Sequence, residues 1–313
     1  MLSVVKEFLE KYNIKNKKVV VGFSAGPDSV AMVFLLFKLA NEFGLEIILA
    51  YFNHNWRPVE ALEEQKFAKE FSKKIKAQFY TDIAPQDSVK SEECARDLRY
   101  AFFEKAMKKY ESDVVFLAHN KNDNIETAIY RIIKGTGVKG LCSIQERRDN
   151  YYRPLLSITK EEILKFLKDN NLEYKIDSSN ENIRYKRNLI RKKVFPLFEE
   201  INPSFLNNVE NLINNSIATR QIVDNELEKF KKNILIENGF DRELYLSYEK
   251  PLRYEFLNDF IGDNFKCRNF KNIKKVDDFI LKNKSSQISI NRCLFLKIKK
   301  NKIFYVEYNN YDK

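Results

Sequence analysis

The sequence lacks paired cysteines, long apolar runs and a secretory segment, and each absence argues against a class of protein. Its 313 residues include four cysteines, none in a C-x-x-C pair, which argues against a zinc ribbon or an iron–sulfur site and fits reduced, cytosolic thiols. No apolar run is long enough to span a bilayer, and no secretory h-region is present. We therefore expect a cytoplasmic protein with no membrane partner. Internal repeats and low-complexity tracts are also absent.

Positive charge is abundant and unevenly distributed. The formal net charge is +11, which indicates a polyanionic partner. Residues 264–313 carry thirteen Lys/Arg and four Asp/Glu, and residues 184–193 carry six Lys/Arg and no acid. We expect nucleic acid to bind these segments. The alternative is a solvated basic surface that only keeps the protein soluble.

One stretch near the N-terminus combines a β-branched run, a turn of small residues and an apolar helical pattern. The run around Val19–Val21 predicts a buried parallel strand, and residues 30–36 predict a helix that Pro27 suits as first residue. Such a turn offers free N–H groups and a helix N-terminus to an anion. It is neither a Walker A loop nor G-x-G-x-x-G, so we expect it to hold a pyrophosphate. The alternative is an ordinary strand–helix turn. The predicted ATP-binding residues are Ser24, Ala25, Gly26, Pro27, Asp28 and Ser29.

The first half of the chain alternates predicted strands and helices. Apolar strands are expected at 45–52, 77–81 and 113–118, and helices at 4–12, 27–43, 59–75, 91–109 and up to 133. This order predicts an α/β fold with a doubly wound parallel sheet. Ligands of such sheets bind beyond the carboxyl ends of the strands. The polar stretches at Ser24, Asn53 and His119 all fall there, which strengthens each as a site candidate.

Both histidines and a pair of carboxylates belong to these strand ends. His54 and His119 are candidates for chemistry, with structural hydrogen bonding as the alternative. Asp123 and Glu126 are three residues apart on one face of a helix start. They can bind Mg²⁺ or act as a general base, or simply interact with the helix dipole. Asp28 is a further candidate Mg²⁺ ligand.

The ordered series of motifs resembles one family of N-type ATP pyrophosphatases, the tRNA(Ile)-lysidine synthases. The resemblance covers roughly residues 15–200. The S-G-G-x-D-S type loop is shared with thiolases and GMP synthetases, whereas the whole ordered set is specific. The motifs are Ser24-Ala25-Gly26-Pro27-Asp28-Ser29, Asn53-His54-x-x-Arg57, Glu93-x-x-Arg96-x-x-Arg99-Tyr100, His119-x-x-x-Asp123-x-x-Glu126-Thr127, Gly135-Thr136-Gly137, Arg153-Pro154-Leu155-Leu156 and Arg187-Asn188-x-x-Arg191.

The resemblance implies a carbon–nitrogen ligase that uses ATP and Mg²⁺. In that family ATP adenylates the C2 oxygen of the cytidine at the first anticodon position of an isoleucine tRNA with a CAU anticodon. Free L-lysine then displaces AMP. The implied catalytic residues are Asp28, His119, Asp123 and Glu126, with Asp28 and Asp123 as metal ligands and His119 or Glu126 as proton acceptor. The implied lysine- or tRNA-binding residues are His54, Arg57, Arg96, Arg99, Arg187 and Arg191. An oligomer is compatible with the sequence.

The chain departs from the family pattern at several positions. Ala25 replaces a loop glycine, and an alanine there is strained if the position requires a positive φ. Asn120, Asn122 and Asn124 replace the more usual His, Asp and Gln. Other readings are a thiolase-type enzyme of the same superfamily, against which the lack of paired cysteines argues, and a non-catalytic RNA-binding protein.

The pattern changes beyond Asn202-Pro203, where we place a boundary between a catalytic domain (1–200) and a smaller, mainly helical α+β domain that binds tRNA (201–313). Helices are expected at 205–234, 252–261 and 270–281, followed by short β segments at 288–290, 293–298 and 303–306. Strand alternation predicts Lys297 and Lys299 on one face and Leu296 and Ile298 on the other. The expected phosphate contacts are Arg292, Lys297, Lys299, Lys300 and Lys302.

Overall fold

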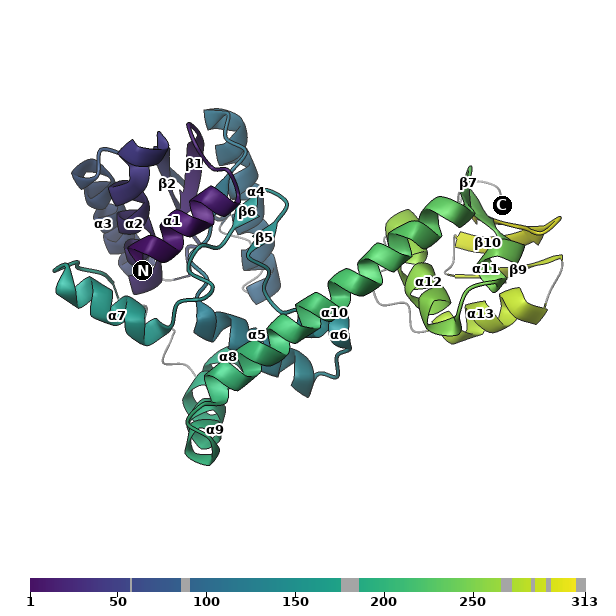
Figure 1. Ribbon diagram of the computed structural model, residues 1–313. Helices are drawn as coiled ribbons and strands as arrows, with labels where there is room; N and C mark the ends of the chain where they lie inside the picture. Colours follow the sequence, from purple (N-terminus) through teal and green to yellow (C-terminus); the bar gives the residue numbers. More distant parts are fainter. Residues whose placement is uncertain are drawn as a thin grey trace. The chain divides into compact units, whose positions relative to one another are not determined.

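The computed structural model divides the chain into two compact units, residues 1–216 and 217–313 (Figure 1). It describes residues 1–56, 58–85, 91–175, 186–265, 272–282, 285–290 and 294–307. Arg57, Arg292, Cys267 and Cys293 lie outside these residues. The two units meet in sequence within the long helix α10 (Phe205–Ile234). The expected functional boundary at 200/201 stays a prediction.

The first unit is built on a sheet whose strand order is β3-β2-β1-β4-β6-β5 in the described residues. All neighbouring strands are parallel except β5 and β6. The chain leaves β1 toward β2 on one side and later returns to its other side with β4. The strands are β1 (Lys18–Gly22), β2 (Glu46–Asn53), β3 (Gln78–Ile83), β4 (Val115–Phe116), β5 (Arg147–Arg148) and β6 (Tyr151–Tyr152).

Helices cover both faces of this sheet because successive strand residues point to opposite sides. Val19 and Val21 pack into a core with α1, α2 and α7, whereas Val20 packs with Phe102 and Phe103 of α4. The doubly wound α/β fold is therefore confirmed (Figure 1). The helices are α1 (Leu2–Lys11), α2 (Pro27–Phe43), α3 (Pro58–Lys74), α4 (Glu92–Tyr110), α5 (Lys121–Ile133), α6 (Val138–Leu141), α7 (Lys160–Asp169), α8 (Lys186–Leu189) and α9 (Phe195–Ile201).

The position of the site follows from this topology. The sheet order changes direction between β1 and β4, and the crevice beyond the carboxyl ends of these strands is the usual ligand position in open α/β sheets. Helix α2 begins directly after the β1 turn, with Gly26 as its extended N-cap and Pro27 as its first residue. Helix α5 begins after β4, with Asn120 as its N-cap. Both helix N-termini therefore lie at the crevice.

The second unit combines helices with an antiparallel sheet of order β7-β8-β11-β10-β9 in the described residues. Its core joins Phe230 of α10, Phe256 of α12 and Ile280 of α13 to Leu296 and Ile303 of the sheet. The expected helical α+β region is confirmed. Its remaining elements are β7 (Leu235–Ile236), β8 (Gly239–Asp241), α11 (Arg242–Leu246), α12 (Lys250–Phe265), α13 (Ile273–Lys282), β9 (Ser286–Ser289), β10 (Leu294–Lys299) and β11 (Lys302–Glu307).

Strand β10 alternates as its sequence predicts. Leu296 and Ile298 are buried, whereas Lys297 and Lys299 are exposed. The turn to β11 uses two residues with positive φ, Lys300 (48°) and Asn301 (59°), which matches the right-handed twist of a two-residue hairpin. No described helix has the length and apolar character needed to cross a membrane.

Candidate functional site

The turn between β1 and α2 is held by hydrogen bonds within the turn itself. The Ser29 hydroxyl accepts a hydrogen bond from the Ser24 N–H at 3.2 Å and donates one to the Gly26 carbonyl at 2.9 Å. The two serine hydroxyl oxygens are 3.3 Å apart. Ser29 is buried, and its hydroxyl holds the loop together. Ser24 is exposed, so its hydroxyl is accessible to a ligand.

Ala25 adopts the left-handed conformation that the sequence analysis considered for this position. Its φ is +61°, and its carbonyl accepts a hydrogen bond from the Lys175 N–H at 2.9 Å. The side chain is fully buried. A left-handed L-residue costs about 1–2 kcal/mol, so this loop stores strain that a glycine would not have.

Asp28 is held by two donors from other parts of the chain. The Lys160 ammonium lies 2.8 Å from both carboxylate oxygens, and the Asn120 amide donates to Oδ1 at 3.1 Å. Asn120 is the N-cap of α5, and Lys160 is the first residue of α7. Three helix N-termini (α2, α5 and α7) therefore contribute residues to one small region.

Further polar contacts connect the starts of α5 and α7. The Asn122 side chain accepts a hydrogen bond from the Lys160 backbone N–H at 2.9 Å. Asn120 and Asp123 form a capping box, as do Thr159 and Glu162. Each helix start is thus locked locally and then joined to its neighbour. Asn120 and Asn122, two of the asparagines that depart from the family pattern, therefore have structural roles here.

Asp123 and Glu126 share an arginine partner. Arg191 donates to both oxygens of Glu126, at 2.5 and 3.0 Å, and its guanidinium lies 3.5 Å from Asp123. The Glu126 side chain is 2% exposed, whereas that of Arg191 is 44% exposed. Arg191 belongs to a π-helical turn (Ile190–Val194), a rare geometry often found at functional sites.

Asp123 has the most perturbed carboxyl of this group. Burial and the neighbouring Glu126 raise its pKa from 3.8 to about 6, and Asp28 adds to the effect. The backbone N–H of Asn120 and the charge of Arg191 act in the opposite direction. The carboxyl therefore titrates close to neutral pH, where a proton acceptor is most effective.

The donor set fits Mg²⁺ bound together with phosphates. The described residues contain no cluster of three or more metal-ligating side chains. Mg²⁺ commonly uses only one or two carboxylates and completes its shell with water and substrate phosphates. Asp28 already attracts a cation, the Lys160 ammonium, and Asp123 has a pKa raised by burial and by the neighbouring carboxylates of Glu126 and Asp28. These two side chains are the ones that would hold the ion.

A second group of side chains is cationic. Arg96, Arg99 and Arg187 influence one another electrostatically, and no carboxylate lies within ion-pair distance of them in the described part of the chain. Burial lowers the pKa of Arg99, and Arg96 and Arg187 lower it further. Arg153 is 4% exposed, and burial together with the charge of Arg96 lowers its pKa, so it lies near the same group. The cluster is an anion-binding candidate.

The two histidines lie among these arginines and are neutral at physiological pH. Burial, followed by Arg153 and Arg99, lowers the pKa of His119 to about 3. Burial and Arg99 lower the pKa of His54 to about 4. In the described residues, Nδ1 of each ring is buried without a hydrogen-bond partner. Both imidazoles can therefore donate or accept a hydrogen bond, but neither binds a proton strongly.

The structure brings the sequence-predicted residues into two groups. Asp28, Asp123, Glu126 and Arg191 interact around the loop. Arg96, Arg99 and Arg187 form the cationic group, and the neutral His54 and His119 lie beside it. Lys160, Asn122 and Arg153 were not predicted as site residues. Only Lys160 had a local signal, because the Thr159-x-x-Glu162 capping box marks a helix start beside it.

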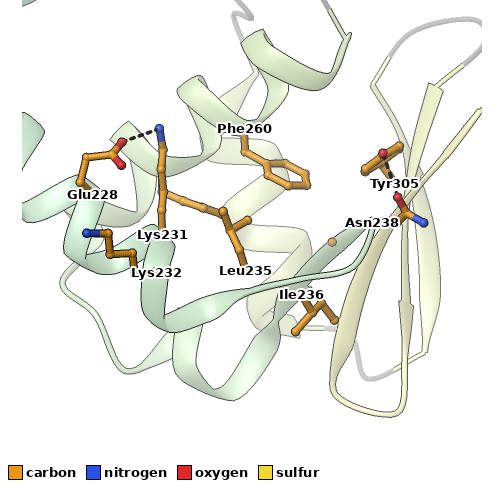
Figure 2. A pocket seen from close by; sticks show the side chains of 10 residues that line it. Glu228, Lys231, Lys232, Leu235, Ile236, Asn238, Phe260 and Tyr305 are labelled. Atoms are coloured by element: carbon orange, nitrogen blue, oxygen red, sulfur yellow. Dashed lines mark hydrogen bonds and ion pairs between the residues drawn. The ribbon is translucent and has the colours of Figure 1, made fainter.

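The second unit has a pocket of about 470 Å³ between α10, α12 and the sheet (Figure 2). Lys231 at its edge is already paired with Glu228 and Asp259, at 3.2 and 3.0 Å. Tyr305 donates to the Asn238 side chain at 3.1 Å. The lining contains neither histidine nor cysteine, and Lys231 is neutralised by its two carboxylate partners. The pocket offers no catalytic arrangement.

The comparisons with known proteins agree with this geometry. Residues 2–198 match the family model of the PP-loop domain. The tRNA(Ile)-lysidine synthase of Clostridium tetani is 35% identical over 234 residues, which cover 72% of this chain and 50% of that protein. The enzyme of the same name from Clostridium perfringens is 32% identical over 303 residues, with coverages of 92% and 64%.

The relatives are longer than this chain. The chain spans about half the length of the first curated relatives it matches. Among solved structures, a U34-tRNA thiolase from Methanococcus maripaludis has a TM-score of 0.53 and 17% identity, covering 68% of this chain and 77% of that one. That likeness supports the fold alone.

Proposed function

The chain belongs to the PP-loop domain family, and on that premise we propose that it joins free L-lysine to a tRNA at the expense of ATP. The proposed product carries lysine at C2 of the cytidine at the first anticodon position of an isoleucine tRNA with a CAU anticodon. The similarity to several tRNA(Ile)-lysidine synthases supports this assignment. These substrates imply a ligase that acts in the cytoplasm.

One observation supports the proposal most strongly: two groups of opposite charge, the carboxylates of Asp123 and Glu126 and the arginines around Arg99, follow the carboxyl ends of the sheet strands, and among the described residues these arginines have no carboxylate partner. Free lysine carries an ammonium at one end and a carboxylate at the other. Asp123 and Glu126 suit the ammonium, and their present partner, Arg191, is exposed enough to be displaced. Arg96 and Arg99 suit the carboxylate, because charge-assisted bonds to arginine are strong and directional.

The first proposed step is adenylation of the tRNA. The cytidine C2 oxygen attacks the α-phosphorus of ATP, and the bond to the bridging oxygen breaks, so pyrophosphate leaves with the negative charge. The Ser24–Ser29 loop and the α2 N-terminus stabilise that charge through N–H donors and the helix dipole. Mg²⁺, held by Asp28 and Asp123, supplies further charge neutralisation when bound.

The second proposed step is attack of the lysine ε-amine on C2, which releases AMP. The amine has to lose its proton first. When Asp123 does not hold the ion, it is a better acceptor than His119, because its pKa of about 6 is closer to neutral pH than the value of about 3 for His119. His119 then serves as a neutral hydrogen-bonding group near the arginines.

The proposed tRNA contacts outside the crevice lie on the second unit. Lys297, Lys299, Lys300 and Lys302 are exposed on the β10–β11 hairpin. The register places Lys297 opposite Phe304, and Phe304 is only partly buried. A second basic surface is a pocket of about 600 Å³ whose lining includes Lys274, Lys275 and Lys282 of α13. Both surfaces suit phosphate backbones.

The test is an incubation of the protein with ATP, lysine and bulk tRNA, followed by AMP assay and nucleoside analysis by mass spectrometry. We expect AMP release that depends on both lysine and tRNA, and one lysine-modified cytidine in the tRNA. A thiolated nucleoside in the tRNA, or AMP release that does not depend on added lysine, would contradict the proposal. tRNA binding without any nucleotide turnover would indicate a non-catalytic RNA-binding protein.

A further inference from the structure

The backbone at Lys160, the first residue of α7, is fixed by several hydrogen bonds. Thr159 caps α7, Glu162 completes the capping box, and Asn122 accepts the Lys160 backbone N–H at 2.9 Å. These contacts fix the main chain, while the side chain remains 36% exposed. The ammonium therefore sits on a flexible stem that begins at a fixed point.

The Lys160 ammonium is paired with Asp28, the carboxylate that we assign to the Mg²⁺ of the nucleotide. Lys160 Nζ lies 2.8 Å from both Oδ1 and Oδ2 of Asp28, and Asn120 takes a further position on Oδ1. Both oxygens of the carboxylate are thus engaged. A divalent cation bound to Asp28 would face an ammonium at close range, and the two like charges repel each other.

We propose that Lys160 holds Asp28 while the nucleotide is absent and moves to the leaving pyrophosphate when Mg²⁺ and ATP bind. The inference rests on the proposed function, because it takes Asp28 as a ligand of the nucleotide's Mg²⁺. The exposed stem gives the ammonium room to move, and the phosphates supply a new anionic partner. Lys160 is then a competitor of the metal in the free protein and a phosphate ligand during adenylation.

This dual role predicts opposite effects of one substitution. Lys160→Met removes the competitor, so half-maximal nucleotide binding should need about 5- to 10-fold less Mg²⁺, a coupling of ordinary size. The same change removes a cation from the leaving group, so single-turnover AMP formation should fall about 100-fold. A lysine that only connects α7 to α2 would change stability without shifting the Mg²⁺ requirement.

Lys160→Arg provides the second variant. The guanidinium remains charged and binds a carboxylate in a bidentate fork, so it should hold Asp28 more firmly. The Mg²⁺ requirement should rise, in the direction opposite to that of Lys160→Met. Lys165→Met, an exposed lysine of the same helix, is the matched control and should behave as the unmodified chain.

The experiment is calorimetric titration of the full chain with a non-hydrolysable ATP analogue across a series of MgCl₂ concentrations. It needs neither lysine nor tRNA, so its outcome is separate from the proposed function. Opposite shifts for the two Lys160 variants support the inference. A Mg²⁺ requirement that is unchanged in both, or that moves the same way in both, overturns it.

The two proposals can fail separately. If the unmodified chain binds the Mg²⁺-nucleotide but forms no lysine-modified tRNA, the proposed function fails and the Lys160 inference is judged on its own curves. If the unmodified chain binds no nucleotide at all, both fail.

Discussion

Each unit contains a buried carboxylate paired with an arginine, and the two pairs differ in how completely they are enclosed. In the second unit, Asp277 is fully buried and accepts bonds from Tyr245 at 2.6 Å and from Arg253 at 2.9 and 3.1 Å. In the first unit, Glu126 is equally buried, but its partner Arg191 is 44% exposed. One network is closed and the other is open at one side.

The difference indicates what each pair does. Every contact of Asp277 comes from within the unit, and Arg253 also donates to the Tyr248 carbonyl at 2.9 Å. Burial and Asp277 raise the pKa of Tyr245, so its hydroxyl remains a donor. Glu126 instead lies beside Asp123, whose pKa is raised by burial and by the charge of Glu126. The closed network stabilises its fold, and the open one can accept a ligand's cation.

The largest expected effect is at the loop of the first unit. Asp28→Ala and Ser29→Ala should each abolish AMP formation, by at least about 1,000-fold, because the nucleotide loses its carboxylate or its loop geometry. The fold should remain intact in circular dichroism and thermal unfolding. Asp169→Ala, at the exposed end of α7, is the control. Normal AMP release from both site variants would remove the loop from the mechanism.

The next effect concerns the closed network. Asp277→Ala leaves Arg253 and the Tyr245 hydroxyl without their buried partner, so the free energy of unfolding should fall by about 3–5 kcal/mol. Denaturant unfolding measures this loss. The neighbouring Asp278→Ala should change stability by less than about 0.5 kcal/mol. Equal effects of the two substitutions would show that the network adds no stability.

The open network predicts a gain in stability. The ionised Asp123 destabilises the folded state, because its pKa is raised, and this cost develops as the pH rises from 3.8 through about 6. Asp123→Asn should therefore raise the free energy of unfolding at pH 8 by up to about 3 kcal/mol and have little effect at pH 4. Turnover should fall far more than tRNA affinity.

Two measurements check that prediction. Thermal unfolding at both pH values tests the stability change, and single-turnover kinetics with separate tRNA-binding curves tests the functional one. A variant that lost tRNA binding and kept its single-turnover rate would show that Asp123 only positions the RNA.

The smallest effect is expected at Ala25. Ala25→Gly relieves about 1 kcal/mol of left-handed strain and loses a buried methyl group worth about 0.8 kcal/mol, so stability should stay within about 0.5 kcal/mol of the unmodified chain. Ala25→Val should cost more than about 2 kcal/mol, since a β-branched residue is strongly disfavoured at positive φ. Equal melting temperatures of the two variants would contradict this.

Local sequence signals predicted most elements of the fold. The helices at 27–43 and 205–234 match the structure at both ends, because Pro27, Gly44 and Pro203 mark helix boundaries in the sequence. Strand β4 lies within the strand expected at 113–118, whereas helix α7 was missed despite its capping box, and the two-residue strands β5, β6 and β7 are too short for a periodic signal. Strand periodicity predicted which lysines of β10 are exposed.

The partners within the site could not be predicted. Lys160 lies 132 residues from Asp28, and Arg191 lies 65 residues from Glu126, so only the tertiary fold brings them together.

Truncation of the basic C-terminus is a poor test of its RNA binding, because the same residues build the core of the second unit. Removing residues 264–313 would delete Ile280, Leu296 and Ile303 from the core of the second unit. Charge-neutralising substitutions of exposed lysines test the same idea without that damage.

We propose that the first unit carries out the chemistry and that the second unit binds RNA. The variant Lys297→Gln/Lys299→Gln/Lys300→Gln/Lys302→Gln tests this division directly through single-turnover AMP formation over a range of tRNA and salt concentrations. We expect an unchanged rate at saturating tRNA, a higher half-saturating tRNA concentration and a salt slope flatter by about 3, since each phosphate contact contributes roughly 0.7–0.9. A slower rate at saturation, or an unchanged half-saturating concentration and slope, would contradict the division.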